Sequence, residues 1–208
     1  MILSLPNSGS SWFARELAAG MKLNYYMEFF NPLRNQKYES ILVKNFGCEL
    51  LSCYRNIVSP GDARIHDDIR KTFGREPYQM TKEVFSPYKL PVFVEHFRVI
   101  VLHRSAAETF PPRRARIWSF YEHIWHALEE TGPRLRAKHV HDRALEAFEV
   151  VSAQLLSDAR RYNVPIISYE DLSRDAYASP ALLFGADAVA QCKKNFVKLA
   201  RPKPGHEN

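Results

Sequence analysis

The stretch Phe97–Arg104, FRVIVLHR, constrains the fold more than any other part of the sequence. Its centre is a continuous apolar run, and a polar turn follows it. A strand whose successive side chains are all apolar is buried on both faces, as in a parallel sheet that is covered by helices. We therefore expect Phe97–Arg104 to be an interior strand of an α/β domain.

Strand patterns alternate with helix patterns along the rest of the chain. The other expected strands are Met1–Leu5, Asn24–Pro32 (a strand or a turn), Tyr78–Phe85 and Val164–Ser168. The expected helices are Ser10–Ala19, Pro60–Phe73 (capped by Ser59), Arg114–Glu130, Asp142–Tyr162, Pro180–Phe184 and Asp187–Leu199. This alternation predicts an α/β fold with a central, mostly parallel sheet flanked by helices. The length of 208 residues fits a single domain, 1–208.

Composition limits the classes of partner. Apolar residues make up 46% of the chain, but no apolar run is long enough to span a bilayer. The three cysteines have no metal-binding spacing, which favours reduced thiols in a cytoplasmic protein. The net charge of +6 favours an anionic ligand or partner, without choosing between a nucleotide, a nucleic acid and a membrane surface.

Ligands of parallel sheets bind beyond the carboxyl ends of the strands, so the turn after the first strand is a candidate site. This turn and the next helix read LPNSGSSWFARELAAG. Backbone N–H groups at the helix start and the hydroxyls of Ser8, Ser10 and Ser11 suit a phosphate, and Gly9 permits a close approach. Trp12 is placed to stack on a base. The alternative is an ordinary serine-rich helix cap, since the lysine of a Walker A loop is absent.

Two further turns follow strands. Arg104 ends the apolar strand Phe97–Arg104, where a guanidinium can hold a phosphate through two parallel hydrogen bonds. Tyr169 leaves the last strand in the sequence YEDL. The alternative for Arg104 is a surface arginine paired with a carboxylate. The alternative for the sequence YEDL is an ordinary helix start, whose acidic residues are favoured by the helix dipole.

The three turns, in this order, resemble those of sulfotransferases that use 3′-phosphoadenosine 5′-phosphosulfate (PAPS). The first loop of that family typically reads P-K-S-G-T-T-W, and its later motifs are a strand ending in arginine and Y-E-D-L. The positions that match the first loop are Pro6, Ser8, Gly9, Ser10, Ser11 and Trp12, with serines in place of threonines. The resemblance spans residues 1 to about 185 and implies a P-loop-NTPase-like sulfotransferase fold.

The resemblance also implies a role for each matching residue. The loop from Pro6 to Trp12 would hold the 5′-phosphosulfate end, with the Trp12 ring on the adenine. Arg104 would bind the 3′-phosphate, and Tyr169 would lie near the adenine. The implied reaction is transfer of a sulfuryl group from PAPS to a hydroxyl of a small molecule, sugar or lipid, without a metal.

A sulfuryl transfer to an alcohol also needs a base. Glu28, in YYMEFFNP, resembles the glutamate of the trehalose and tyrosylprotein types, although a purely structural carboxylate fits the same pattern. The rival bases are His96, in VEHFRVIV, and more weakly His66, in RIHDD. Lys82, in MTKEV, resembles a family strand that helps to line the site.

The chain departs from the family pattern at two places. Asn7 stands where the family has a lysine or arginine that neutralises the departing phosphate oxygen, so Lys82 and Arg15 are the candidate replacement cations. Pro112 stands where the family has a serine near the 3′-phosphate. Arg113, with its neighbour Arg114, either grips that phosphate in another way or forms a solvated basic face.

Three functions remain open from the sequence. The first is an active sulfotransferase, and the second is a catalytically weak protein that binds PAPS or its product 3′-phosphoadenosine 5′-phosphate (PAP). The third is another phosphate-loop protein, such as a small kinase; nucleic acid is disfavoured because the aromatic residues follow core-helix spacing. The pairs His123/His126 and His139/His141 lack a third ligand, so the sequence predicts no metal.

Overall fold

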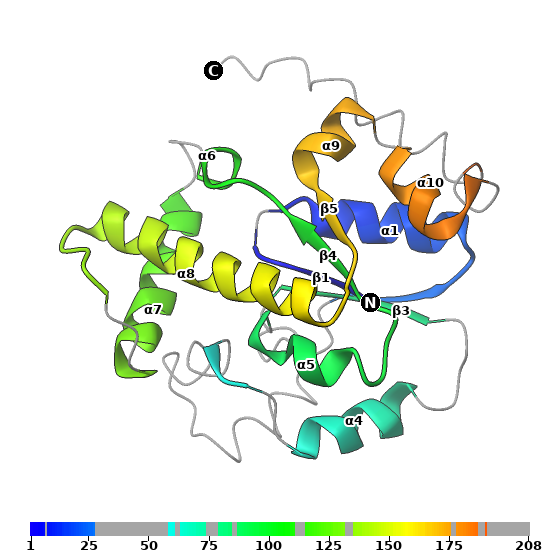
Figure 1. The fold of residues 1–208 in the computed structure, drawn as a ribbon, viewed down its shortest axis with the longest axis horizontal. Helices are drawn as coiled ribbons and strands as arrows, with labels where there is room; N and C mark the ends of the chain where they lie inside the picture. The colour runs from blue at the N-terminus through cyan, green and yellow to red at the C-terminus, as the bar shows by residue number, and fades with distance from the viewer. Residues whose placement is uncertain are drawn as a thin grey trace.

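The computed structural model describes residues 1–6, 8–27, 58–60, 63–73, 79–84, 87–110, 115–131, 135–175, 178–186 and 190. The described strands form one sheet of order β2-β3-β1-β4-β5, in which all neighbouring strands are parallel (Figure 1). They are β1 (Ile2–Ser4), β2 (Asn24–Met27), β3 (Gln79–Glu83), β4 (Ile100–His103) and β5 (Ile166–Ser168). The α/β fold with a parallel central sheet flanked by helices is therefore confirmed.

The central strand β1 is buried on both faces because helices cover the sheet on each side. Ile2 lies opposite Ile100 of β4, and both side chains join the apolar cluster beneath α1 (Ser10–Gly20). Leu3 and Val101 point to the other face and join the larger cluster. Successive side chains of β4 thus point to opposite faces of the sheet, and both faces belong to the core. A strand in this position needs a continuous apolar run, as the sequence of β4 has.

The helices form two layers. On one face, α1 shares its apolar cluster with residues of α9 (Tyr169–Arg174) and α10 (Ala178–Phe184). The other face is covered by α4 (Ala63–Phe73), α5 (Leu90–Phe93), α7 (Ala115–Thr131) and α8 (Val140–Arg161) (Figure 1). Two short helices, η1 (Pro87–Lys89) and α6 (Ala106–Thr109), lie in the connections after β3 and β4. No helix among the described residues combines the length and the apolar character needed to cross a membrane.

The helix expected from Pro60 begins later, at Ala63. Ser59, the expected cap, instead lies in a bend whose carbonyl accepts a hydrogen bond from Lys89 Nζ at 3.1 Å, so this segment is tied to η1. Of the expected last helix, Asp187–Leu199, only residue 190 is described. The strand expected from Asn24 to Pro32 is seen as far as Met27, and its remainder lies outside the described residues.

The direction of chain connection changes at β1. The chain passes from β1 to β2 on one side of the sheet, returns to β3, and then crosses to β4 and β5 on the other side. Crevices form at such switch points beyond the carboxyl ends of the strands, because the flanking connections diverge there. The turns after β1, β4 and β5 therefore lie at the edge of the sheet where a ligand is expected.

Candidate functional site

The turn after β1 leaves the start of α1 open to an anion. Gly9 is the N-cap residue of α1, with φ +80°, and no side chain caps this helix. The N–H groups of Ser10 and Ser11 have no acceptor within the helix, as at every helix start. The first turn of α1 also contains no acidic residue. The positive end of the helix dipole therefore meets no competing carboxylate of its own helix.

Buried hydroxyls line the same turn. Ser8 and Ser10 are only 2% and 3% exposed. Within the described part of the chain, Ser8 Oγ has no hydrogen-bond partner, and neither has the buried Ser4 Oγ at the end of β1. A buried hydroxyl without a partner costs about 1–3 kcal/mol, which a ligand's oxygen would recover. Pro6 is partly buried in the turn, and Asn7 lies outside the described residues.

Lys82 brings a positive charge to the first turn of α1. Strand β3 lies beside β1, with Lys82 opposite Ile2, and the Lys82 side chain is almost fully buried. Its Nζ donates a hydrogen bond to Ser11 Oγ at 2.9 Å. Arg15, the other candidate cation, is 66% exposed and pairs with the neighbouring Glu16. Among the described residues, Lys82 is therefore the candidate cation that contacts the start of α1 from a neighbouring strand.

Tyr169 joins the turn after β5 to the turns after β1 and β4. A Cβ built on Gly9 would lie 2.6 Å from Tyr169 Cε2, so the tyrosine ring packs directly on the glycine. The Arg104 guanidinium carbon lies 4.1 Å from the centroid of the same ring, which is cation–π distance. The three turns that the sequence singled out are thus in contact through Gly9, Tyr169 and Arg104.

Arg104 is largely buried, and its guanidinium is paired with an exposed carboxylate, that of Glu108. Its side chain is 16% exposed, and its Nη2 donates to Glu108 Oε2 at 3.2 Å. Glu108 is 58% exposed, and ion pairs with such an exposed partner contribute about 0–1 kcal/mol. A phosphate with two negative charges can therefore displace Glu108 at little cost.

Glu170 fixes the position of the Arg104 turn, a role that the sequence reasoning missed. The backbone N–H of Ser105 donates to Glu170 Oε1 at 2.9 Å, which ties the turn after β4 to α9. Burial alone would raise the pKa of Glu170, but the hydrogen bonds from Ser105, together with smaller contributions from its own backbone N–H and from His103, hold the pKa below its ordinary value. Ser168 caps α9 by accepting from the Asp171 N–H at 3.0 Å, so the expected helix start is present as well.

His96 lies away from these turns. It follows α5 and precedes β4, so it belongs to the amino-terminal edge of the sheet, and its Nε2 lies 2.8 Å from His66 Nδ1. Burial, with smaller contributions from His66 and Arg70, lowers its pKa. The structure therefore does not bring His96 together with the turns around Gly9.

The remaining predicted residues divide into two groups. Trp12 lies in the first turn of α1, partly buried against the apolar cluster on that face, with its ring centroid 6.5 Å from that of Phe13. Glu28 and Arg113 lie outside the described residues, as does Pro112. Strand β2 ends at Met27, the residue that precedes Glu28 in the sequence.

No protein-family model matches the chain, and comparison with curated proteins gives no match either. The resemblance to PAPS-dependent sulfotransferases thus remains a prediction that rests on the motifs and on the contacts between them.

Proposed function

We propose that the protein transfers a sulfuryl group from PAPS to a hydroxyl acceptor. The observation that carries the proposal is the hydrogen bond from Lys82 Nζ to Ser11 Oγ. It delivers a buried positive charge to the loop in which Asn7 has replaced the lysine of the resembling family. The cation needed near the departing oxygen is then supplied from the neighbouring strand rather than from the loop itself.

The described residues fit a nucleotide with phosphates at both its 3′ and 5′ positions. The N–H groups of Ser10 and Ser11 and the hydroxyl of Ser8 suit the 5′ end, because they lack competing acceptors in α1. Arg104 would hold the 3′-phosphate in exchange for Glu108. Trp12 and Tyr169 would contact the adenine. When bound, PAPS would supply the activated sulfuryl group.

The residues can then move the proton and the charge that the reaction requires. The Glu28 carboxylate would accept the proton of the acceptor hydroxyl, whose oxygen bonds to sulfur while the bond from sulfur to the phosphate oxygen breaks. Negative charge is left on that phosphate oxygen, where Lys82 and the loop N–H groups meet it. One such preorganised donor contributes about 2.7–4 kcal/mol to lowering a barrier.

Calorimetry with three nucleotides tests the nucleotide part of this proposal. We expect PAP to bind more tightly than AMP, which lacks the 3′-phosphate, and more tightly than ATP. Arg104→Ala should bring the affinity for PAP down to about that for AMP, a loss of roughly tenfold to a hundredfold for a charge-assisted hydrogen-bond partner.

The matched control is Arg98→Ala. Arg98 also lies over an aromatic ring, that of Phe184 at 6.0 Å, but it precedes β4 instead of following it. Its removal should leave the preference for PAP intact. Equal binding of PAP and AMP by the unaltered protein would refute the 3′-phosphate site, and a preference for ATP would favour the small-kinase alternative.

A further inference from the structure

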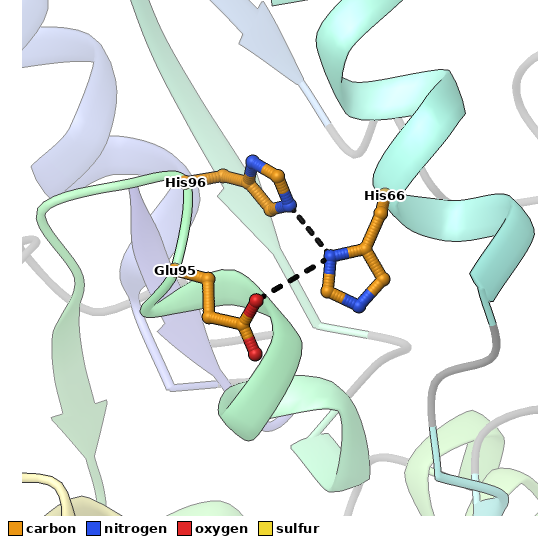
Figure 2. A group of neighbouring side chains, drawn as sticks. All are labelled: His66, Glu95 and His96. Atoms are coloured by element: carbon orange, nitrogen blue, oxygen red, sulfur yellow. Dashed lines mark hydrogen bonds and ion pairs between the residues drawn. The ribbon is translucent and has the colours of Figure 1, made fainter.

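A second group of ligand-type side chains lies where α4 meets the turn after α5. His66 comes from α4, while Glu95 and His96 come from the turn, and Figure 2 shows all three pointing toward one another. Among the described residues this is the one group of three His, Cys, Asp or Glu side chains whose ligand atoms all lie within 4.8 Å of one another.

His96 and Glu95 both approach a single atom, His66 Nδ1. His96 Nε2 lies 2.8 Å from it, and Glu95 Oε2 lies 3.6 Å from it (Figure 2). A neutral His66 has at most one proton on this nitrogen, which cannot bridge both neighbours with good geometry. A small cation between the three atoms would satisfy all of them at once.

The spacing suits a tetrahedral zinc-type ion. Bonds of about 2.0–2.1 Å at tetrahedral angles place two ligand atoms about 3.3–3.4 Å apart. The separation of 3.6 Å between His66 and Glu95 is close to this value, and the two histidine nitrogens at 2.8 Å need to part by about half an ångström. Rotation of partly exposed side chains accommodates such a shift.

The cluster is accessible to solvent, and the charge of the neighbouring Arg70 does not oppose the binding of a cation. The His66 side chain is 25% exposed and that of Glu95 is 63% exposed, so an ion can reach them from solvent and keep a water as fourth ligand. The nearby Arg70 is paired with Asp67, whose Oδ1 accepts from Arg70 Nη2 at 2.8 Å. The positive charge of Arg70 is thereby largely compensated.

We propose that His66, Glu95 and His96 bind one divalent transition-metal ion of the zinc type, which clips α4 to the turn before β4. Two imidazoles and a carboxylate are typical ligands of zinc and its neighbours and not of magnesium or calcium. The sequence predicted no metal because its histidine pairs lack a third ligand, whereas this cluster joins three ligands from two different parts of the chain. The site lies at the opposite edge of the sheet from Gly9 and does not depend on the sulfuryl-transfer proposal.

Metal titration of the chelator-treated protein tests this inference. Zn²⁺ added in competition with a chromophoric chelator should fill one tight site, and Co²⁺ should give the visible spectrum of a tetrahedral site without a thiolate charge-transfer band. His66→Gln and His96→Gln should weaken binding by more than about 100-fold, beyond the effect of losing an outer hydrogen-bond partner. Zinc should also raise the melting temperature, because it binds only the folded state.

The matched control is His126→Gln. His126 faces Glu129 on α7 with Nδ1 3.7 Å from Oε2, a histidine–glutamate pair at almost the spacing of His66 and Glu95. This variant should bind zinc like the unaltered protein. Glu95→Gln removes the charged ligand at an exposed position, where the substitution should not disturb folding. It should weaken zinc binding at least as much as the loss of an outer hydrogen-bond partner, about 10- to 100-fold.

Two results would overturn the inference. The first is unchanged zinc affinity in the His66, His96 and Glu95 variants. The second is a thiolate band in the Co²⁺ spectrum, which would assign the metal to cysteine. PAP binding should be the same with and without zinc, so failure of one proposal is distinguishable from failure of the other.

Discussion

At the scale of single residues, Gly9 and Gly185 form a natural matched pair. Both have a left-handed backbone, with φ +80° and +85°. Their surroundings differ, since a Cβ on Gly9 would lie 2.6 Å from the Tyr169 ring, while a Cβ on Gly185 would meet nothing within 4 Å. The backbone strain of a substitution can therefore be separated from the overlap with Tyr169.

We predict that Gly9→Ala lowers the free energy of unfolding more than Gly185→Ala does. Both variants incur the left-handed penalty of about 1–2 kcal/mol. Only Gly9→Ala adds the overlap with Tyr169, about 1–3 kcal/mol for an overpacked contact, and only it should impair PAP binding. Urea unfolding and calorimetry measure the two effects. Equal losses of stability would show that Tyr169 moves away freely and does not hold the loop.

Lys82 offers the residue-scale test of catalysis. Lys82→Met keeps the approximate length of the side chain and removes its charge. The rate at which PAPS is converted to PAP by sulfuryl transfer should therefore fall by about 100- to 1,000-fold. PAP affinity should fall much less, because most of its contacts lie elsewhere. The exposed Lys71 on α4 provides the control, Lys71→Met, with unchanged turnover. An unaltered rate in Lys82→Met, with circular dichroism showing a folded protein, would exclude Lys82 from the reaction.

At the scale of elements, Glu170 joins the turn after β4 to α9 through the Ser105 N–H. Its pKa in the folded protein lies below its ordinary value. The unfolded chain therefore binds the proton first as the pH falls. The stability that this carboxylate contributes is present above its ordinary pKa of about 4.3 and is lost as the pH falls through its folded pKa.

We accordingly predict that Glu170→Gln lowers the free energy of unfolding by about 1 kcal/mol at pH 7. As the pH falls below about 4.3 the difference from the unaltered protein should shrink, because the Glu170 carboxylate is then protonated first in the unfolded chain and, below its lowered folded pKa, in the folded protein as well. Denaturation series at several pH values measure this change. Glu149→Gln, at an exposed position of α8, is the control and should have little effect at any pH. A constant difference down to pH 3 would contradict the assigned charge.

Elements with a clear periodicity were predictable. The long helices α7 and α8 begin and end within two residues of their expected bounds, since their apolar stripes extend over several turns. The short helices η1 and α5 were missed because a single turn shows no period. Gly9, Arg104 and Tyr169 were expected together because residues that follow parallel strands share an edge.

The missed contacts depend on packing that local sequence does not encode. An acidic residue at a helix start is already explained by the helix dipole, so nothing in the sequence pointed from Glu170 to Ser105. His66 and His96 were each named as weak alternatives for a base, and Glu95 was not singled out. These three side chains meet only because α4 packs next to α5. The face of α4 that is turned toward α5 is determined by packing throughout the core, which local sequence does not reveal.

At the scale of the whole molecule, the two candidate binding sites lie at opposite edges of the sheet. Its carboxyl-terminal edge gathers an open helix start, Lys82 and Arg104, which suit an anionic ligand. Its amino-terminal side has the cluster of His66, Glu95 and His96, which suits a cation. Strand β4 connects the two, since it begins shortly after His96 and ends directly before Arg104.

The position of β1 at the centre of the sheet has a consequence for synthesis on the ribosome. β1 precedes β3 and β4 by about 80 to 100 residues, since Ile2 pairs with Lys82 and Ile100, which leave the ribosome much later. Until then the nascent chain carries an apolar strand without its partners, a state that chaperones bind and proteases cleave. Ribosome-bound chains that stop before β4 should therefore remain protease-sensitive. Protection should appear only after β4 has left the exit tunnel, and earlier protection would show that α1 and β1 are sheltered in another way.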